Sequence, residues 1–73
     1  MSSEEQIIKY LLFKDNVFFI DLCKEIFYDE EHFCELWKAY ARLLNQGVLQ
    51  YSGNCAYVRI TDKFFAEMVL RYG

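Results

Sequence analysis

Lys38, Arg42 and Arg59 are the residues of this 73-residue chain whose types and spacing suit contact with phosphate groups. Lys38 and Arg42 lie four residues apart, so a helix would place them on one ridge. Arg59 belongs to a stretch of alternating apolar and polar residues, in which Gln50 and Tyr57 share its polar side. Lys and Arg neutralise phosphates, and Gln and Tyr can hydrogen-bond to sugar or phosphate oxygens. These five residues form the candidate binding set.

Acidic residues oppose this basic set. Four carboxylates come shortly before Lys38 in the chain: Asp29, Glu30, Glu31 and Glu35. On a helix, Glu31 and Glu35 would continue the ridge of Lys38 and Arg42, because the spacings are three and four residues. Such a ridge is most often a solvated face with ion pairs between successive turns. A phosphate-binding ridge and an acidic or solvated ridge therefore both stay open.

Metal binding and catalysis are not indicated by the remaining reactive residues. The candidate metal ligands are Cys23, Asp29, His32 and Cys34. Their spacing fits no common zinc pattern, and a helix would point His32 and Cys34 about 200° apart. The chain has one His, no Gly-rich phosphate loop and no nucleophile-elbow motif. We expect no metal, no cofactor and no enzymatic activity.

Composition predicts one small domain, residues 1–73, with more apolar surface than its core can hide. Hydrophobic residues make up 55% of the chain and aromatic residues 19%. A domain of this size buries only about 60% of the surface that its unfolded chain exposes. We therefore expect an interface, most simply that of a homodimer. The net charge of −3 argues against non-specific binding to nucleic acids or anionic membranes.

The chain also predicts a protein of a reducing, cytoplasmic compartment. No apolar run approaches the roughly 18 residues of a membrane span, so no membrane partner is expected. The residues Met1 to Glu5 are polar and acidic, unlike a secretory signal. Three cysteines are an odd number and do not form a disulfide framework.

Three helices are predicted in the first two thirds of the chain. The first runs from Ser3 to about Lys14, with Ser3 and Gln6 as a capping box. The second spans Phe18 to Phe27, with Phe19, Leu22, Cys23 and Ile26 on one face. The third runs from about Glu30 to Gln46, after Asp29 as N-cap and before Gly47 as the stop. Its core side is expected to hold Phe33, Leu36, Trp37, Tyr40, Leu43 and Leu44.

A β-hairpin and a fourth helix follow. Gly53-Asn54 suits a two-residue turn, which pairs Ser52 with Cys55, Tyr51 with Ala56, Gln50 with Tyr57 and Leu49 with Val58. The apolar side of this hairpin is then Leu49, Tyr51, Ala56, Val58 and Ile60. Thr61 is predicted to cap a helix from Asp62 to about Tyr72.

The order helix, helix, helix, strand, strand, helix resembles a winged helix-turn-helix domain, most of all the MarR or PadR style of transcription regulator. One stretch that carries the resemblance is LLNQGVLQ, which is similar to the end of a recognition helix entering the wing. The other is YVRITDKFFAEM, which is similar to the second wing strand, a Thr-x-x-Gly motif and a closing helix, with Phe64 in place of the Gly. An unrelated small α+β domain with a helical hairpin and a β-hairpin is the alternative fold. The two stretches indicate the fold more specifically than the function, because one fold hosts many functions.

The resemblance implies a small DNA-binding regulator. Its third helix would lie in the major groove of duplex DNA, which makes Lys38, Arg42, Arg59, Gln50 and Tyr57 the expected DNA contacts. A homodimer would form through the first and fourth helices, at Ile8, Leu12, Phe64 and Leu70; alternatively, these four residues cover the core of their own chain. In the other functional hypothesis, the fold binds a basic protein partner through Asp29, Glu30, Glu31 and Glu35 and does not bind DNA.

Overall fold

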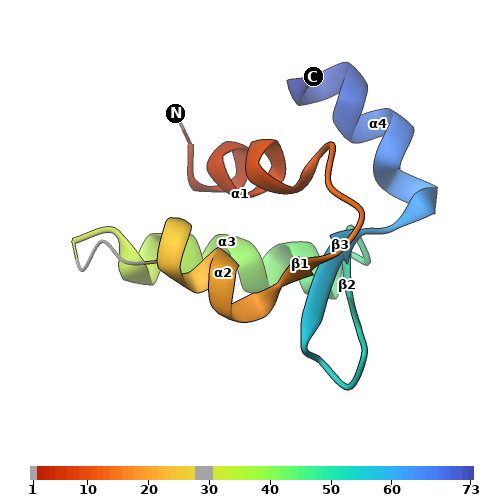
Figure 1. Ribbon diagram of the computed structural model, residues 1–73. Helices are drawn as coiled ribbons and strands as arrows, with labels where there is room; N and C mark the ends of the chain where they lie inside the picture. Colours follow the sequence, from red (N-terminus) through yellow and green to blue (C-terminus); the bar gives the residue numbers. More distant parts are fainter. Residues whose placement is uncertain (1, 28–30) are drawn as a thin grey trace.

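Helices dominate the fold, and a small antiparallel sheet closes one end of it (Figure 1). The computed structural model describes residues 2–27 and 31–73. Its elements are α1 (Ser3–Leu11), β1 (Val17–Phe18), α2 (Phe19–Glu25), α3 (Phe33–Asn45), β2 (Leu49–Ser52), β3 (Tyr57–Ile60) and α4 (Asp62–Tyr72). The predicted fold class, mainly α with a small hairpin, is confirmed, and the four helices and two hairpin strands follow in the predicted order.

The helices form two levels around one core. α1 packs across α3, α2 lies against α3 through Phe19 and Trp37, and α4 rises from the sheet to contact α1 (Figure 1). The two chain ends lie on the same side, where the Tyr72 hydroxyl donates to the Glu4 carboxylate at 3.2 Å. The core is one cluster, with residues from every helix and strand: Ile7, Ile8, Leu11, Leu12, Val17, Leu22, Phe27, Leu36, Ala39, Tyr40, Leu43, Val48, Leu49, Val58, Ile60 and Met68.

α1 begins at Ser3 as predicted, but its cap is Ser2, one residue before the predicted cap, and the helix ends earlier than predicted. The Ser2 hydroxyl, not that of Ser3, accepts the backbone N–H of Glu5 at 3.1 Å, so the predicted Ser3–Gln6 capping box is wrong. The helix stops at Leu11, and the Lys14 amine donates to the carbonyl of Tyr10 near that end. A basic side chain can satisfy such a terminal carbonyl, which ordinarily lacks a partner in the helix.

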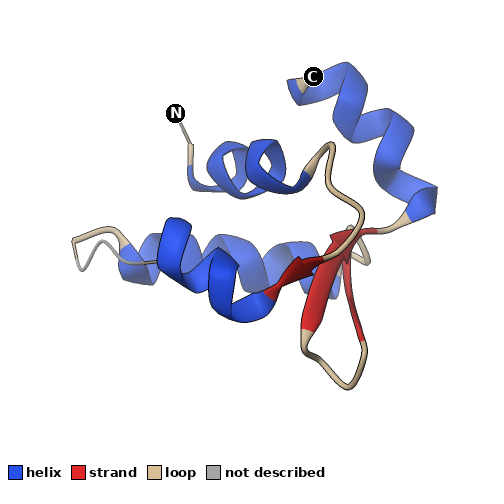
Figure 2. Ribbon diagram, in the orientation of Figure 1, coloured by secondary structure: helices blue, strands red, loops and turns tan. Residues whose placement is uncertain are grey.

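β1 is a strand where the sequence predicted the start of a helix. Phe18 pairs with Tyr57 and Val17 with Val58, so β3 is the central strand in the order β1-β3-β2 (Figure 2). The Phe19 N–H then donates to the Ala56 carbonyl at 2.8 Å. α2 therefore begins at Phe19 rather than Phe18, and it ends at Glu25 rather than Phe27.

α3 ends at Asn45, one residue before the predicted Gln46, and Gly47 follows it as the predicted stop. Gly47 has φ +81°, the Val48 N–H bonds the Leu43 carbonyl at 2.9 Å, and the Gly47 N–H bonds the Leu44 carbonyl at 3.1 Å. These bonds form the Schellman motif, which needs a left-handed residue that glycine adopts without a steric penalty. The helix begins at Phe33 rather than Glu30. The predicted cap Asp29 lies outside the described residues, as does Glu30.

The hairpin register differs from the prediction by two residues. Leu49 pairs with Ile60, Gln50 with Arg59, Tyr51 with Val58 and Ser52 with Tyr57. The loop therefore contains four residues rather than two, and Gly53, Asn54 and Cys55 have positive φ angles of 57°, 57° and 69°. A shift of two preserves the side-chain alternation. Leu49, Val58 and Ile60 accordingly stay in the core, whereas Ala56 moves into the loop and is exposed.

Thr61 precedes α4 as predicted, but its hydroxyl does not cap the helix. It donates instead to the carbonyl of Gly47 at 2.8 Å, and its backbone N–H bonds the Val48 carbonyl at 2.9 Å. Thr61 thus ties the end of α3 to the base of the hairpin, which fixes α3 relative to the sheet.

Candidate nucleic-acid interface

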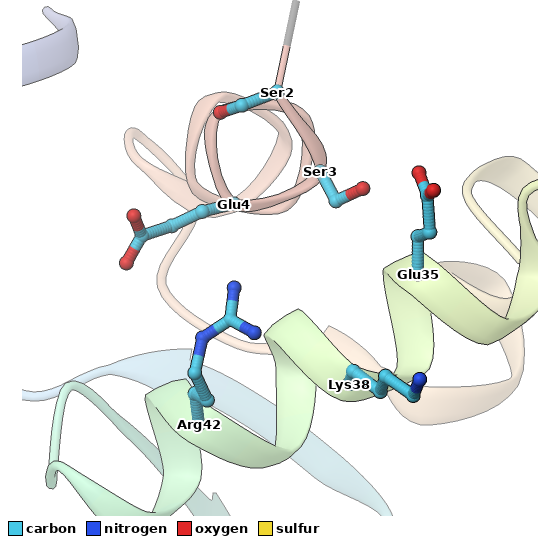
Figure 3. Close-up of a pocket in the computed structure, with 6 residues that line it drawn as sticks. All are labelled: Ser2, Ser3, Glu4, Glu35, Lys38 and Arg42. Atoms are coloured by element: carbon cyan, nitrogen blue, oxygen red, sulfur yellow. The ribbon is translucent and has the colours of Figure 1, made fainter.

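A shallow groove runs between the first turn of α1 and the exposed side of α3. Its volume is about 320 Å³, and its lining is Ser2, Ser3, Glu4, Glu35, Lys38 and Arg42 (Figure 3). The structure thus brings together the two predicted helix cations, Lys38 and Arg42. The buried side of α3 carries Leu36, Ala39, Tyr40 and Leu43, which turns both cations outward.

Lys38 and Arg42 have no ion pair with any residue in the described ranges 2–27 and 31–73. The other two arginines contrast with Arg42: Arg59 contacts Asp62 at 2.6 Å, and Arg71 contacts Glu67 at 3.9 Å. In Figure 3, Arg42 rises from α3 toward α1, while Lys38 points away from it along the helix. Both cations are exposed and therefore available to an anion.

Carboxylates border the same groove. Glu35 and Ser3 face the gap from α3 and α1, and Glu4 lies above Arg42 (Figure 3). Glu4 accepts the Tyr72 hydroxyl, and burial, followed by the charge of Glu4, raises the pKa of Tyr72. Glu31 is exposed, and Asp29 and Glu30 lie outside the described residues. The groove therefore holds two cations and two carboxylates, so its local charge is balanced.

The three predicted hairpin contacts lie on another surface. Gln50 is exposed and pairs with Arg59 across the hairpin. Tyr57 precedes Arg59 by two residues on β3, so its side chain lies on the same face of the sheet. The Arg59 side chain is 33% exposed and bonded to Asp62, the first residue of α4. None of these three residues lines the groove on α3. The five predicted contacts therefore divide into a helix pair and a sheet trio.

The four predicted dimer residues have different environments. Ile8 is 0% and Leu12 3% exposed, because their own chain covers both; this corresponds to the alternative in which they serve the core. Phe64 is partly buried and packs against that core. Leu70 alone among the four is largely exposed, at 88%.

Exposed aromatic rings are the feature that the sequence interpretation missed. Phe33 and Trp37 were assigned to the core side of the third helix, yet they are 43% and 42% exposed. Their rings stack at 6.0 Å with an angle of 7°. A second exposed pair joins Phe13 to Phe65. The sequence did contain a signal for the first pair. Phe33 and Trp37 are four residues apart at the margin of the apolar stripe, and this spacing makes two side chains neighbours on the helix surface.

The cysteines do not form a metal centre in the described part of the chain. Cys34 and Cys55 are exposed, whereas Cys23 is partly buried and burial raises the pKa of its thiol. Across residues 2–27 and 31–73, no three His, Cys, Asp or Glu side chains lie together as metal ligands would. Within the same ranges, every helix is too short or too polar to cross a bilayer.

Comparison of the chain with known protein families, with curated proteins and with solved structures found no match. Function must therefore be argued from the site itself.

Proposed function

We propose that the chain is a winged helix-turn-helix domain that binds duplex DNA, with α3 as the groove-contacting helix. The element order and the sheet order β1-β3-β2 support this proposal. α3 has 13 residues and is about 20 Å long, and a B-DNA major groove about 12 Å wide admits such a helix. The Schellman motif and the Thr61 bonds hold α3 rigidly against the hairpin.

The observation that carries the proposal is the pair of cations without carboxylate partners on the outward side of α3. Lys38 and Arg42 are one turn apart, and neither must break an ion pair to meet a phosphate. Arg59, with Gln50 and Tyr57 beside it, would add a contact from the wing. Because Glu35 shares the groove and the net charge is −3, binding should be modest and strongly weakened by salt.

The test is the salt dependence of binding to a random-sequence duplex, measured by fluorescence anisotropy at low ionic strength. Lys38→Ala with Arg42→Ala should weaken binding and reduce the slope of log K against log salt by about 1.8, because each neutralised phosphate contributes about 0.9. Lys63→Ala with Arg71→Ala, on α4, is the matched control, since it removes one Lys and one Arg from another helix.

An unchanged slope in the Lys38/Arg42 variant, or an equal reduction in the α4 control, would refute the assignment to α3. The control variant also shows whether the loss of two positive charges lowers affinity by itself.

The role that follows is transcription regulation by a homodimer in the cytoplasm. A dimer would double a small contact set, and the largely exposed Leu70 is the predicted interface residue that remains available to a second chain. Three free cysteines suit a reducing compartment.

A protein-interaction function is the second candidate, and the exposed stack of Phe33 on Trp37 favours it. Both rings lie on α3, which also carries the exposed carboxylate Glu35, and the exposed Glu31 lies two residues before the helix. A partner with basic and apolar side chains would complement that surface. Absence of any complex with random duplex at micromolar protein and low salt would favour this function over DNA binding, because even non-specific binders associate under those conditions.

A further inference from the structure

The outer face of the three-stranded sheet carries an aromatic pair beside an arginine. Alternation along the strands buries Val17, Val58 and Ile60 on the inner face. The opposite face then consists of Phe18, Gln50, Ser52, Tyr57 and Arg59, which the register places on adjacent strands. Of these five residues, Arg59 is the one that is charged at neutral pH, and its charge is positive. The polar residues Gln50 and Ser52 are neutral.

Phe18 and Tyr57 form the closest ring pair of the described residues. Their centroids are 4.6 Å apart at an angle of 33°, and Phe18 is 49% exposed. The Tyr57 ring packs closely against the backbone of Gly53 in the loop. A Cβ atom at position 53 would lie only 2.8 Å from Tyr57 Cδ2. The ring pair is thus fixed by the strand register and by the loop before any ligand arrives, which lowers the entropic cost of stacking on it.

Arg59 lies two residues beyond Tyr57 on β3, about 6.6 Å further along the strand. Asp62 holds its guanidinium group through one bond at 2.6 Å, and an Arg has five N–H donors, so donors remain for an anion. The Asp62 side chain is 92% exposed, and an exposed ion pair of this kind contributes little stability. A phosphate can therefore compete for Arg59.

Two other exposed aromatic pairs have carboxylates close to them. Phe33 and Trp37 share α3 with Glu35, and Glu31 precedes that helix by two residues. Phe65, which contacts Phe13, lines a hollow with Asp15 and Asp62, although Lys14 and Arg59 line the same hollow. On the outer sheet face, the side chains beside the rings are Arg59, whose carboxylate partner is Asp62, and the neutral Gln50 and Ser52.

We infer that the outer face of the sheet binds single-stranded nucleic acid, with a base stacked on the Phe18–Tyr57 pair and the adjacent phosphate at Arg59. Aromatic rings next to a cation are the chemistry by which proteins hold unpaired bases, because every base has a π face and each base is followed by a phosphate. Lys38 and Arg42 on α3, which carry the proposed duplex binding, take no part in this activity, whereas Arg59 and Tyr57 would contact both ligands.

The test compares three labelled oligonucleotides of equal length by fluorescence anisotropy at low salt: oligo(dT), oligo(U) and an abasic strand. Stacking predicts that the abasic strand binds more weakly than oligo(dT), although it carries the same phosphates. The comparison of oligo(dT) with oligo(U) then shows which of these two strands the site prefers. Equal affinity for oligo(dT) and the abasic strand would overturn the inference.

Phe18→Leu with Tyr57→Leu keeps an apolar surface but removes both rings. We expect this variant to bind oligo(dT) roughly 5- to 150-fold more weakly, which corresponds to one to three kcal/mol per stacked base. Phe13→Leu with Phe65→Leu is the matched control, because it removes another exposed ring pair, in which the rings lie edge to face; its affinity should stay within about two-fold of wild type. Equal losses in both variants would contradict the site.

Two further measurements keep the result interpretable. Circular dichroism checks that the double variant is folded; if it is not, Phe18→Leu alone, at a position already half exposed, takes its place. Lys38→Ala with Arg42→Ala should bind oligo(dT) like wild type even though it binds duplex DNA more weakly. Weaker binding of both ligands by that variant would indicate one shared site on α3 and overturn the proposal for the sheet.

Discussion

Tyr40 should make the fold sensitive to alkaline pH. The residue is 1% exposed, and its hydroxyl donates to the Tyr51 hydroxyl at 2.8 Å. Burial, followed by this hydrogen bond, raises the pKa of Tyr40 far above its ordinary value of about 10. Folding therefore favours the protonated form of Tyr40. The contribution of this tyrosine to the free energy of unfolding is fully present below about pH 10. It is lost as the pH rises above that value, because ionisation of the tyrosine then stabilises the unfolded chain.

The size of the effect follows from linkage. At pH 11 the ionisation of Tyr40 in the unfolded chain alone should lower the free energy of unfolding by about 1.4 kcal/mol, and at pH 12 by about 2.7 kcal/mol. Tyr40→Phe removes that loss together with the hydrogen bond to Tyr51, which should cost about 1 kcal/mol at pH 8. Wild type should therefore be the more stable protein at pH 8 and the less stable one at pH 11, and the two curves should cross at about pH 10.6.

Urea denaturation followed by far-ultraviolet circular dichroism, at each pH from 8 to about 11, measures both curves. Tyr51→Phe serves as the control, because it removes the same hydrogen bond but leaves the Tyr40 hydroxyl in the core. That control should keep the alkaline loss of wild type. If wild type and Tyr40→Phe differed by a constant amount at every pH, the reasoning about Tyr40 would be refuted.

Two further predictions concern local backbone geometry. Ser2→Ala should lower the free energy of unfolding by about 1 kcal/mol because it removes the α1 cap, whereas Ser3→Ala should have a smaller effect; equal losses in urea titrations would contradict the assignment of the cap. Gly47→Ala should cost about 1 to 2 kcal/mol, since φ is +81° there, and a thermal midpoint equal to that of wild type would show that the turn relaxes without strain.

The helices could be predicted because each carries a repeated apolar spacing, and such spacing is a local property of the chain. Phe33 and Trp37 show the limit of that reasoning, because periodicity gives the direction of a side chain and not whether a neighbour covers it. The strand β1 could not be predicted in this way. Two residues are too few to show alternation, and the pairing of Phe18 with Tyr57 joins distant parts of the chain. The same long-range contact explains the wrong hairpin turn, since Ala56 uses its carbonyl for Phe19 rather than for β2.

The candidate site was predicted only in part for similar reasons. A spacing of four residues was enough to place Lys38 and Arg42 on one side of a helix, and the structure brings both to one groove. The partner of Arg59 was not foreseen, although Asp62 follows only three residues later, because the contact crosses from a strand into a helix. The sequence did not predict that α1 borders this groove. The position of Ser2 and Glu4 beside α3 depends on tertiary packing, and the residues near them in the sequence do not determine that packing.

The pairing of β1 with β3 also has a consequence for how the domain responds to ligands. Phe18 comes from the first third of the chain and Tyr57 from the last third, so the hairpin alone cannot assemble their ring pair. The pair exists only when both halves have docked. A molecule that occupies it binds the native state and not the unfolded chain, so it raises the stability of the whole domain in proportion to the logarithm of its concentration. Thermal melting in the presence of candidate ligands would then screen this face without a label, and the shift would vanish in any variant that prevents β1 from docking.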